Sequence, residues 1–176
     1  VDIAARLRSR VADGNVLKQA RLAELGTKLA ARLVRQYQSG FRPKPDIWFT
    51  YHIYYKAPDW IGPIVADALG IPYVVAEASF APKRANGPWG QSHLAVETAI
   101  RQADAVFSLN RVDMECLAQV CQPDRLHFLP PFTRVASWHV GQRVAINPEW
   151  VRLVTTAMMR DGDKLKSYEV LVKALG

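Results

Sequence analysis

The sequence predicts an α/β protein built on a Rossmann-like, doubly wound parallel sheet with flanking helices. Apolar runs at 47–51 and 73–76 are each introduced by proline and are too short for buried helices, so they indicate strands. Gly70 stands where a left-handed helix C-cap is expected, which places a helix between these strands. The apolar face of that helix is Ile61, Ile64, Val65, Ala68 and Leu69. Strands joined through a helix lie parallel, and continued alternation of helix and strand is typical of layered α/β folds.

Two helices are predicted before this central unit. Ile3, Leu7 and Val11 share one helical face, which ends at Asp13-Gly14. A longer helix follows, with the apolar stripe Leu22, Leu25, Leu29 and Leu33. Its other faces carry the basic residues Lys18, Arg21, Lys28, Arg32 and Arg35. This basic surface indicates either a solvated helix face or a helix that rests on a membrane surface.

The alternation continues after the central unit. A loop rich in glycine and proline precedes a helix over 93–102, and strands are predicted at 105–109 and 126–129. The residues expected to face inward on the first helix are Leu94, Ala95, Thr98 and Ala99. Asn110 is expected to cap a helix between the two strands. The apolar face of this capped helix is Val112, Cys116, Leu117 and Val120.

A polar segment over 132–150 lacks periodicity and is interpreted as a linker between two domains. Beyond it, a strand is predicted over 153–157, and a helix follows. The apolar face of this last helix is Leu165, Tyr168, Leu171, Val172 and Leu175. Because the chain starts without methionine and ends just after this new strand and helix, we expect it to be a fragment of a longer protein.

The composition indicates which classes of molecule the protein is expected to bind. Lysine and arginine exceed aspartate and glutamate by 23 to 16, which gives a net charge of +7 and favours anionic partners. No apolar run approaches the roughly 18 residues that would span a bilayer, and no signal-peptide stretch opens the chain, so we expect a soluble, cytoplasmic protein. Cys116 and Cys121 have no partners at zinc-ligand spacing and are interpreted as ordinary thiols.

Candidate site residues follow the ends of the two central strands. Parallel sheets bind ligands beyond the carboxyl ends of their strands, where His52 can hydrogen-bond an acceptor hydroxyl or a sugar. Aromatic residues in the next loop can stack on apolar sugar faces, or can instead cap the core: Tyr54, Tyr55 and Trp60. Glu77 and the loop cations Lys83 and Arg84 are expected to complete this rim.

A second candidate is the turn over 158–164. Arg160 and Lys164 in this turn and Lys166 just after it, together with helix N-terminal amides, suit a diphosphate, although a charged surface turn is the alternative. Asp161-Gly162-Asp163 has the spacing of a metal and nucleotide motif, but this triplet is also a common turn. We therefore expect no metal site.

Several segments resemble group 1 glycosyltransferases of bacteria, the GT-B type with two Rossmann-like domains. The segments that resemble this family are GIPYVVAE at 70–77, ADAVFSL at 103–109 and RLHFLPP at 125–131. The resemblance covers about residues 45–176. It implies an incomplete GT-B arrangement, with a partial acceptor-side domain over 1–131, a linker over 132–150 and the first donor-side unit over 151–176.

The resemblance also implies an activity, namely transfer of a sugar from a nucleotide-diphosphate donor to a glycan, lipid or small-molecule acceptor, with retention and without metal or other cofactor. Arg160 matches the family's phosphate-binding arginine, either Lys164 or Lys166 matches its lysine, and Glu77 matches an acidic position. His52 would be the catalytic residue. Two alternatives stay open: a nucleotide- or RNA-binding module without enzymatic activity, and a sugar-nucleotide epimerase of the same architecture.

Overall fold

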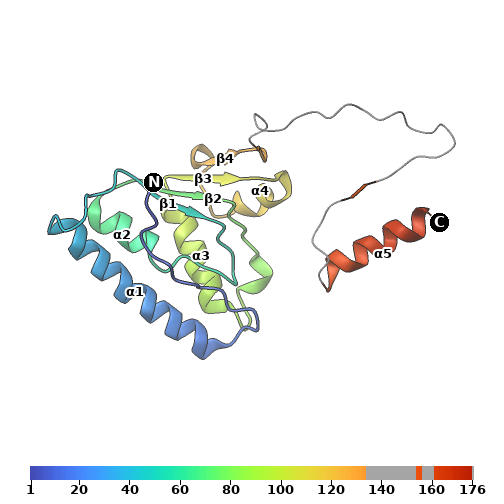
Figure 1. Cartoon of the computed structure of the whole chain (residues 1–176), viewed down its shortest axis with the longest axis horizontal. Coiled ribbons are helices and arrows are strands. Elements are labelled where there is room, and N and C mark those ends of the chain that lie inside the picture. Colours follow the sequence, from blue (N-terminus) through green and yellow to red (C-terminus); the bar gives the residue numbers. More distant parts are fainter. Residues whose placement is uncertain (134–153, 156–160, 176) are drawn as a thin grey trace. The chain divides into compact units, whose positions relative to one another are not determined.

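The computed structural model of the chain describes residues 1–133, 154–155 and 161–175 (Figure 1). The chain divides into two units, Val1–Thr133 and Arg134–Gly176. The linker predicted over 132–150 lies almost wholly outside the described residues. The same holds for the strand predicted over 153–157, of which only residues 154–155 are described.

The first unit confirms the predicted α/β fold. Its four strands are all parallel and lie in the order of the chain: β1 (Trp48–Tyr51), β2 (Tyr73–Ala76), β3 (Ala105–Ser108) and β4 (Leu126–Phe128). Each strand is the apolar run that the sequence indicated, to within one residue at either end. The sheet is therefore a Rossmann-like parallel sheet with β1 and β4 as its edges.

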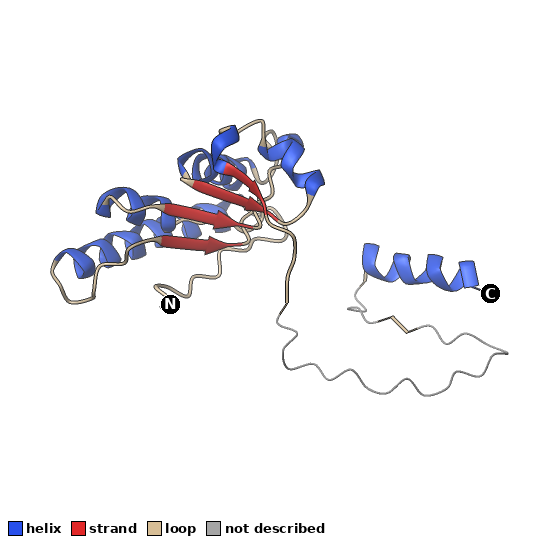
Figure 2. Cartoon of the chain, turned by 90° about the horizontal axis from the view of Figure 1, so that it is seen from above, coloured by secondary structure: helices blue, strands red, loops and turns tan. Residues whose placement is uncertain are grey.

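Four α-helices accompany these strands: α1 (Val16–Gln38), α2 (Gly62–Leu69), α3 (Gly90–Gln102) and α4 (Arg111–Leu117). Short 3₁₀ turns lie at Pro82–Arg84 and Pro123–Arg125. Right-handed crossovers that always step in the same direction place their helices on one face of the sheet. Accordingly, Val75 and Val106 share a core cluster with Val96 of α3 and Leu117 of α4, and Figure 2 shows helices gathered behind the strands.

The opposite face of the sheet is more open within this unit. It carries Phe49 and Tyr51 on β1, whose exposed fractions are 58% and 62%. On β4 the same face carries His127, which is also exposed. The alternation of half-buried and exposed residues along β1 follows directly from this one-sided cover.

The N-terminal segment differs from the prediction, because residues 1–15 form no helix. Residues 6–11 instead alternate between exposed and more buried positions, the period of an extended chain, with Arg6, Arg8 and Arg10 outward. Leu7 packs against the cluster that α1 and α2 form. The Val11 amide donates to the Lys56 carbonyl at 2.7 Å. The periodicity of Ile3, Leu7 and Val11 was therefore a wrong basis for a helix.

Helix α1 forms as predicted, but its buried face is rotated. The buried residues are Gln19, Gly26, Ala30 and Leu33. Leu25, expected in the apolar stripe, is 44% exposed. Small residues face the core because the helix lies close to the segment before α2: a Cβ added at Gly26 would stand 2.3 Å from Cβ of Trp60. Close approach, and not side-chain size, decides which face is buried.

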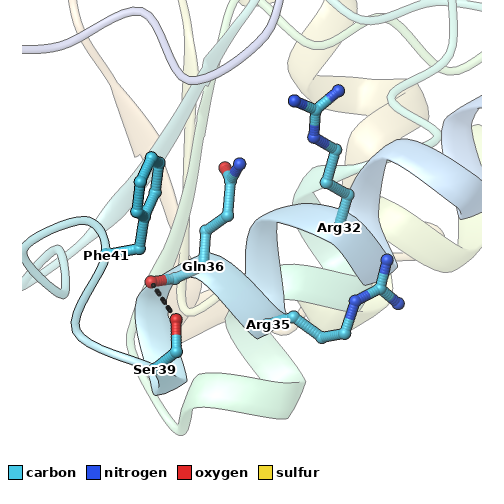
Figure 3. A pocket seen from close by; sticks show the side chains of 5 residues that line it. All are labelled: Arg32, Arg35, Gln36, Ser39 and Phe41. Atoms are coloured by element: carbon cyan, nitrogen blue, oxygen red, sulfur yellow. Dashed lines mark hydrogen bonds between the residues drawn. The ribbon is translucent and has the colours of Figure 1, made fainter.

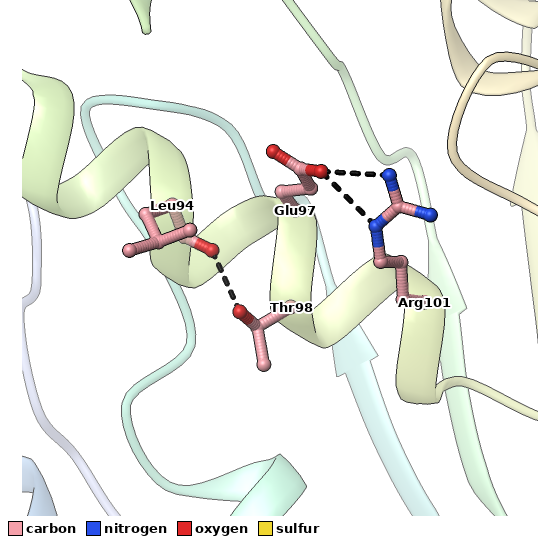
Figure 4. A network of polar contacts seen from close by, with 4 residues as sticks. All are labelled: Leu94, Glu97, Thr98 and Arg101. Atoms are coloured by element: carbon pink, nitrogen blue, oxygen red, sulfur yellow. Dashed lines mark hydrogen bonds and ion pairs between the residues drawn. The ribbon is translucent and has the colours of Figure 1, made fainter.

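Helix α3 is rotated in the same way. Its buried residues are Ser92, His93, Val96, Ala99 and Ile100. Leu94, expected to face inward, is 62% exposed, and Thr98 is exposed as well. Figure 4 shows the outer surface: Thr98 bonds back to the Leu94 carbonyl, and Arg101 donates twice to Glu97. The outer face of α3 is thus a solvated surface of local polar contacts.

Helix α4 begins as predicted, because the Asn110 side chain accepts from the Asp113 amide at 2.8 Å. Its inward face is shorter than expected: Leu117 and Val120 are buried, while Val112 is 77% exposed. At the end of α2, Gly70 has φ +60°, as expected for a left-handed C-cap.

The second unit is described mainly by its helix α5, Asp163–Leu175. The predicted helix is confirmed, and Gly162 before it has φ +98°. Leu171 and Val172 are 40% and 68% exposed, so this helix buries little of its apolar face within its own unit. None of the helices in the described parts of the chain is long and apolar enough to cross a membrane.

The Asp59 carboxylate joins β1, β2 and the start of α2. Its Oδ2 accepts from Thr50 Oγ1 at 2.6 Å and from the Tyr73 hydroxyl at 3.1 Å. Its Oδ1 accepts from the amides of Ile61 and Gly62 at 2.9 and 2.8 Å. This side chain therefore serves as the N-terminal cap that Ile61 cannot provide.

Gly62→Ala is expected to be strongly destabilising. A Cβ at Gly62 would stand 2.2 Å from Asp59 Oδ2 and 2.6 Å from Trp48 Nε1. Relieving this overlap should lower the free energy of unfolding by about 1–3 kcal/mol, measured by urea denaturation. Gly87→Ala is the control, because a Cβ there meets nothing within 4 Å. Equal stability of the two variants would contradict the packing described for Asp59.

Tyr73 should make stability fall at high pH. Burial, followed by the neighbouring Asp59 carboxylate, raises the pKa of this phenol well above its usual 10.0. Above pH 10.0 the unfolded chain binds fewer protons than the folded chain, so the free energy of unfolding decreases as pH rises. Tyr73→Phe should be less stable at neutral pH, by about 1 kcal/mol, but should lose stability less steeply above that pH. Parallel profiles in denaturation experiments would refute this role.

Candidate functional site

His52 and Glu77 form a pair at the carboxyl edge of the sheet. Each residue directly follows its strand, and the register pairs the preceding residues Tyr51 and Ala76. The His52 amide donates to the Ala76 carbonyl, and the Glu77 amide donates to Phe107, each at 2.8 Å. His52 Nδ1 lies 3.1 Å from Glu77 Oε1. Both side chains are partly exposed, at 49% and 34%, so a ligand can reach them.

Both residues of this pair have left-handed backbones. His52 has φ +64° and Glu77 has φ +57°, and they are the non-glycine residues of the described chain with positive φ. A side chain in this region costs about 1–2 kcal/mol per residue. Such strain is often found at functional sites, where the surrounding structure maintains it. Here it turns both side chains off the ends of their strands and brings them together.

The pair has a defined chemistry. A carboxylate at Nδ1 favours the tautomer that carries its proton there, which leaves His52 Nε2 as a hydrogen-bond acceptor. The same carboxylate affects Tyr51: a hydrogen bond to Glu77 raises the pKa of that phenol. The arrangement can therefore hold a hydroxyl group at Nε2 and accept its proton.

An aromatic row extends from this pair. The row consists of Tyr51, His52, Tyr54, Tyr55 and Trp89. The centroids of His52 and Tyr54 lie 5.0 Å apart, those of Tyr54 and Tyr55 5.7 Å, and those of Tyr55 and Trp89 5.4 Å. These three contacts are edge-to-face, the geometry that aromatic pairs favour.

Three basic side chains accompany the aromatic row. Arg10 Nε donates to the Tyr54 hydroxyl at 3.3 Å. Lys56 Nζ lies 5.6 Å from the ring centroid of Tyr55 and 5.3 Å from that of Trp89. The corresponding distances for Arg84 Cζ are 5.1 and 5.4 Å. These are cation–π distances, so the rim is both aromatic and positively charged.

The far end of the row is held by α1 and the N-terminal segment. Trp89 Nε1 donates to the Val11 carbonyl at 3.0 Å. Buried Gln19 donates to the Pro88 carbonyl at 2.7 Å, and its Oε1 accepts from Ser92 Oγ at 2.6 Å. Gln19 therefore connects α1 to the loop and to the first turn of α3. These bonds fix the backbone on both sides of Trp89.

The predicted site residues are thus only partly gathered. Five of them lie together at the pair and the aromatic row: His52, Glu77, Tyr54, Tyr55 and Arg84. Lys83 is exposed beside them in the sequence, and Trp60 lies elsewhere, against α1. In the second unit, Lys164 and Lys166 are exposed in the first turns of α5. Arg160 lies outside the described residues.

Sequence reasoning missed Trp89, Lys56 and Arg10 as members of the rim. Lys56 lies within the aromatic loop, and Trp89 lies in the predicted loop at the carboxyl edge, so their positions were a usable signal. Arg10 was hidden by the incorrect helix assignment. Asp59 also had a signal, because it precedes the predicted helix at the spacing of a capping aspartate.

Two hollows of the first unit lie away from the pair and the aromatic row. Figure 3 shows one at the end of α1, lined by Arg32, Arg35, Gln36, Ser39 and Phe41. The guanidinium groups of Arg32 and Arg35 extend in different directions there, so they do not converge on one point. A second, mainly apolar groove of about 320 Å³ includes Trp60, Ile64 and Leu94 in its lining.

Groups suited to metal or thiol chemistry are sparse. In the described ranges, no three histidine, cysteine or acidic residues are grouped so that they could hold a metal ion. Cys116 and Cys121 are free thiols, and burial raises the pKa of Cys121. The predicted interpretation of these residues as ordinary thiols agrees with this arrangement.

Comparison with known proteins adds no assignment: neither a scan against known protein families nor a search of curated proteins finds a match to this chain. The described geometry therefore defines the candidate site: a strained histidine and glutamate pair beside an aromatic and basic rim.

The strain at His52 can be measured. His52→Gly should be more stable than His52→Ala by about 1 kcal/mol, because glycine adopts positive φ without a steric penalty. Thr98, within α3, is the matched control: there the glycine variant should be less stable than the alanine variant, by about 1 kcal/mol. Urea denaturation of the four variants tests the difference in sign, and the same order at both positions would contradict the strained backbone.

Proposed function

We propose that this chain takes part in transfer of a sugar from a nucleotide-diphosphate donor to a glycan, lipid or small-molecule acceptor. The observation that carries the proposal is the pairing of His52 with Glu77 at the carboxyl edge of a parallel sheet. Ligands of such sheets bind at this edge. In this proposal, residues 1–131 form the acceptor side and residues 151–176 begin the donor side.

Each residue at the edge has a role in the proposed reaction. His52 Nε2 accepts a hydrogen bond from the acceptor hydroxyl, while Glu77 holds the imidazole by its Nδ1. Tyr54 and Tyr55 offer ring surface and hydroxyl groups to a sugar. In the proposed step the bond from the anomeric carbon to the donor phosphate oxygen breaks and its electron pair leaves with the nucleoside diphosphate. The acceptor oxygen bonds to the same face of that carbon, with retention of configuration, and its proton passes to His52 Nε2.

The donor side needs positive charge, because negative charge develops on the departing diphosphate. Arg160 and either Lys164 or Lys166 supply it in the proposal, helped by amides at the start of α5. With these cations in place, neither a metal nor another cofactor is required. The same charges would bind the donor by its phosphates.

We place the proposed reaction in the cytoplasm, with contact to a membrane surface as an additional feature. The surface of α1 supports this second part, since its basic residues Lys18, Arg21, Lys28, Arg32 and Arg35 are all exposed. Leu17, on the same helix, is 83% exposed. Basic helices with exposed apolar residues bind anionic lipid head groups.

The test uses the protein expressed from the complete open reading frame that encodes this chain. It measures the release of nucleoside diphosphate from a panel of sugar donors. His52→Ala and Arg160→Ala should each lower kcat/KM roughly tenfold or more, the effect of losing one charge-assisted contact. His127→Ala is the matched control, because His127 is exposed on β4 and contacts the Phe107 ring. Its activity should be unchanged.

The proposal fails if no donor is consumed, or if His52→Ala and His127→Ala behave alike. Tight binding of RNA without turnover would instead support a binding module. Interconversion of the donor sugar without transfer would support an epimerase. Melting curves of each variant separate loss of activity from loss of folding.

A further inference from the structure

The aromatic row and its cations define the charge of the molecule that binds there. Tyr55 and Trp89 meet at an interplanar angle of 86°, and both Lys56 and Arg84 approach each of the two rings. Both cations therefore lie at the same pair of rings. Positive charges gathered along one rim favour an anionic ligand there.

Within the part of the chain that the structure describes, no carboxylate neutralises these cations. Among the described residues, Arg10, Lys56 and Arg84 form no ion pair, whereas Lys28 and Arg101 each pair with a glutamate on their own helix. Arg84 Nε is buried and has no hydrogen-bond partner in this part of the chain. A buried donor without an acceptor is unfavourable. Because solvent does not reach Nε, an anion would bind the delocalised charge of the Arg84 guanidinium and not Nε itself.

The same geometry argues against a nucleic acid. Stacking of bases requires free faces on aromatic rings. Here Lys56 and Arg84 lie over Tyr55 and Trp89, and these rings contact each other edge to face. A ligand that presents a negative group to the cations and hydroxyl groups to His52 and Tyr54 fits the row better.

We propose that the ligand of this rim is an acidic saccharide, whose carboxylate or phosphate binds Lys56 and Arg84 while a neighbouring hydroxyl group reaches His52. Its role as the acceptor of sugar transfer rests on the proposed function. The binding of an anionic saccharide does not. The hydroxyl groups of Tyr54 and Tyr55 would hydrogen-bond the saccharide between the two ends of the row.

Binding to the 176-residue chain tests the proposal directly, by calorimetry with a short oligogalacturonate, glucose 1-phosphate and a neutral galactose oligomer. The acidic ligands should bind, more weakly as salt increases, and the neutral oligomer should bind at least tenfold more weakly. The two acidic ligands distinguish a carboxylate from a phosphate as the recognised group. Equal binding of acidic and neutral oligomers would overturn the proposal.

Variants locate the site. Lys56→Gln and Arg84→Gln should each weaken binding of the preferred acidic ligand about tenfold, the value of one charge-assisted contact. Lys44→Gln removes the same charge from an exposed residue outside the rim and should leave affinity unchanged. If Arg84→Gln unfolds, Lys56→Gln and the charge-preserving Arg84→Lys still test the site. The proposed site would be wrong if the acidic ligand bound with equal affinity to Lys56→Gln, Lys44→Gln and the unmodified chain.

Two further outcomes separate this proposal from the proposed function. In the first outcome, the chain binds an acidic saccharide but the protein expressed from the complete open reading frame transfers no sugar. This result would support the acidic saccharide as the ligand of the rim and would reject the transferase. Transfer to neutral acceptors that Lys56→Gln leaves unchanged would keep the transferase and reject the acidic ligand. Binding of a single-stranded RNA oligomer in preference to both saccharides would reject the acidic ligand, and if no sugar transfer is measured either, it would also reject the transferase.

Discussion

The Asp59 carboxylate is the interaction on which the arrangement of the first unit depends. Its oxygens accept from β1 through Thr50, from β2 through Tyr73, and from two amides at the start of α2. This carboxylate is partly buried, and four donors satisfy its oxygens. Loss of the carboxylate would leave those donors without a partner and would free α2 from the strands that it connects.

This constraint explains how strain can persist at the site. The carboxyl ends of β1 and β2 are fixed by their ladder, and Asp59 also holds Thr50 next to the end of β1 and Tyr73 at the start of β2, so the chain leaves the strands in a defined direction. His52 and Glu77 accept left-handed backbones because the amide of each residue keeps its hydrogen bond to the neighbouring strand. The energy for this geometry comes from the core beneath, where Val75 and Val106 are completely buried.

The sequence was a good guide wherever a short apolar run decided the structure. All four strands, the C-cap at Gly70 and the placement of His52 and Glu77 at one edge follow from rules on propensity and parallel connection, whereas their direct contact was not predicted. The buried faces of α1 and α3 could not be predicted in this way, because Gln19 and Ser92 occupy core positions and satisfy each other there. Because these polar residues are buried only when they pair in the folded chain, a hydrophobic pattern does not predict the buried faces of the two helices.

The aromatic row shows why a site can be harder to predict than a fold. One end, at His52, belongs to the sheet and is set by local rules. The other end, at Trp89, is held by Val11 and, through its neighbour Pro88, by Gln19, residues roughly seventy positions earlier in the chain. The two ends are therefore anchored independently, one by the core and one by the N-terminal segment. A ligand that spans the row would contact both, so its binding would depend on the N-terminal segment even though no catalytic group lies there.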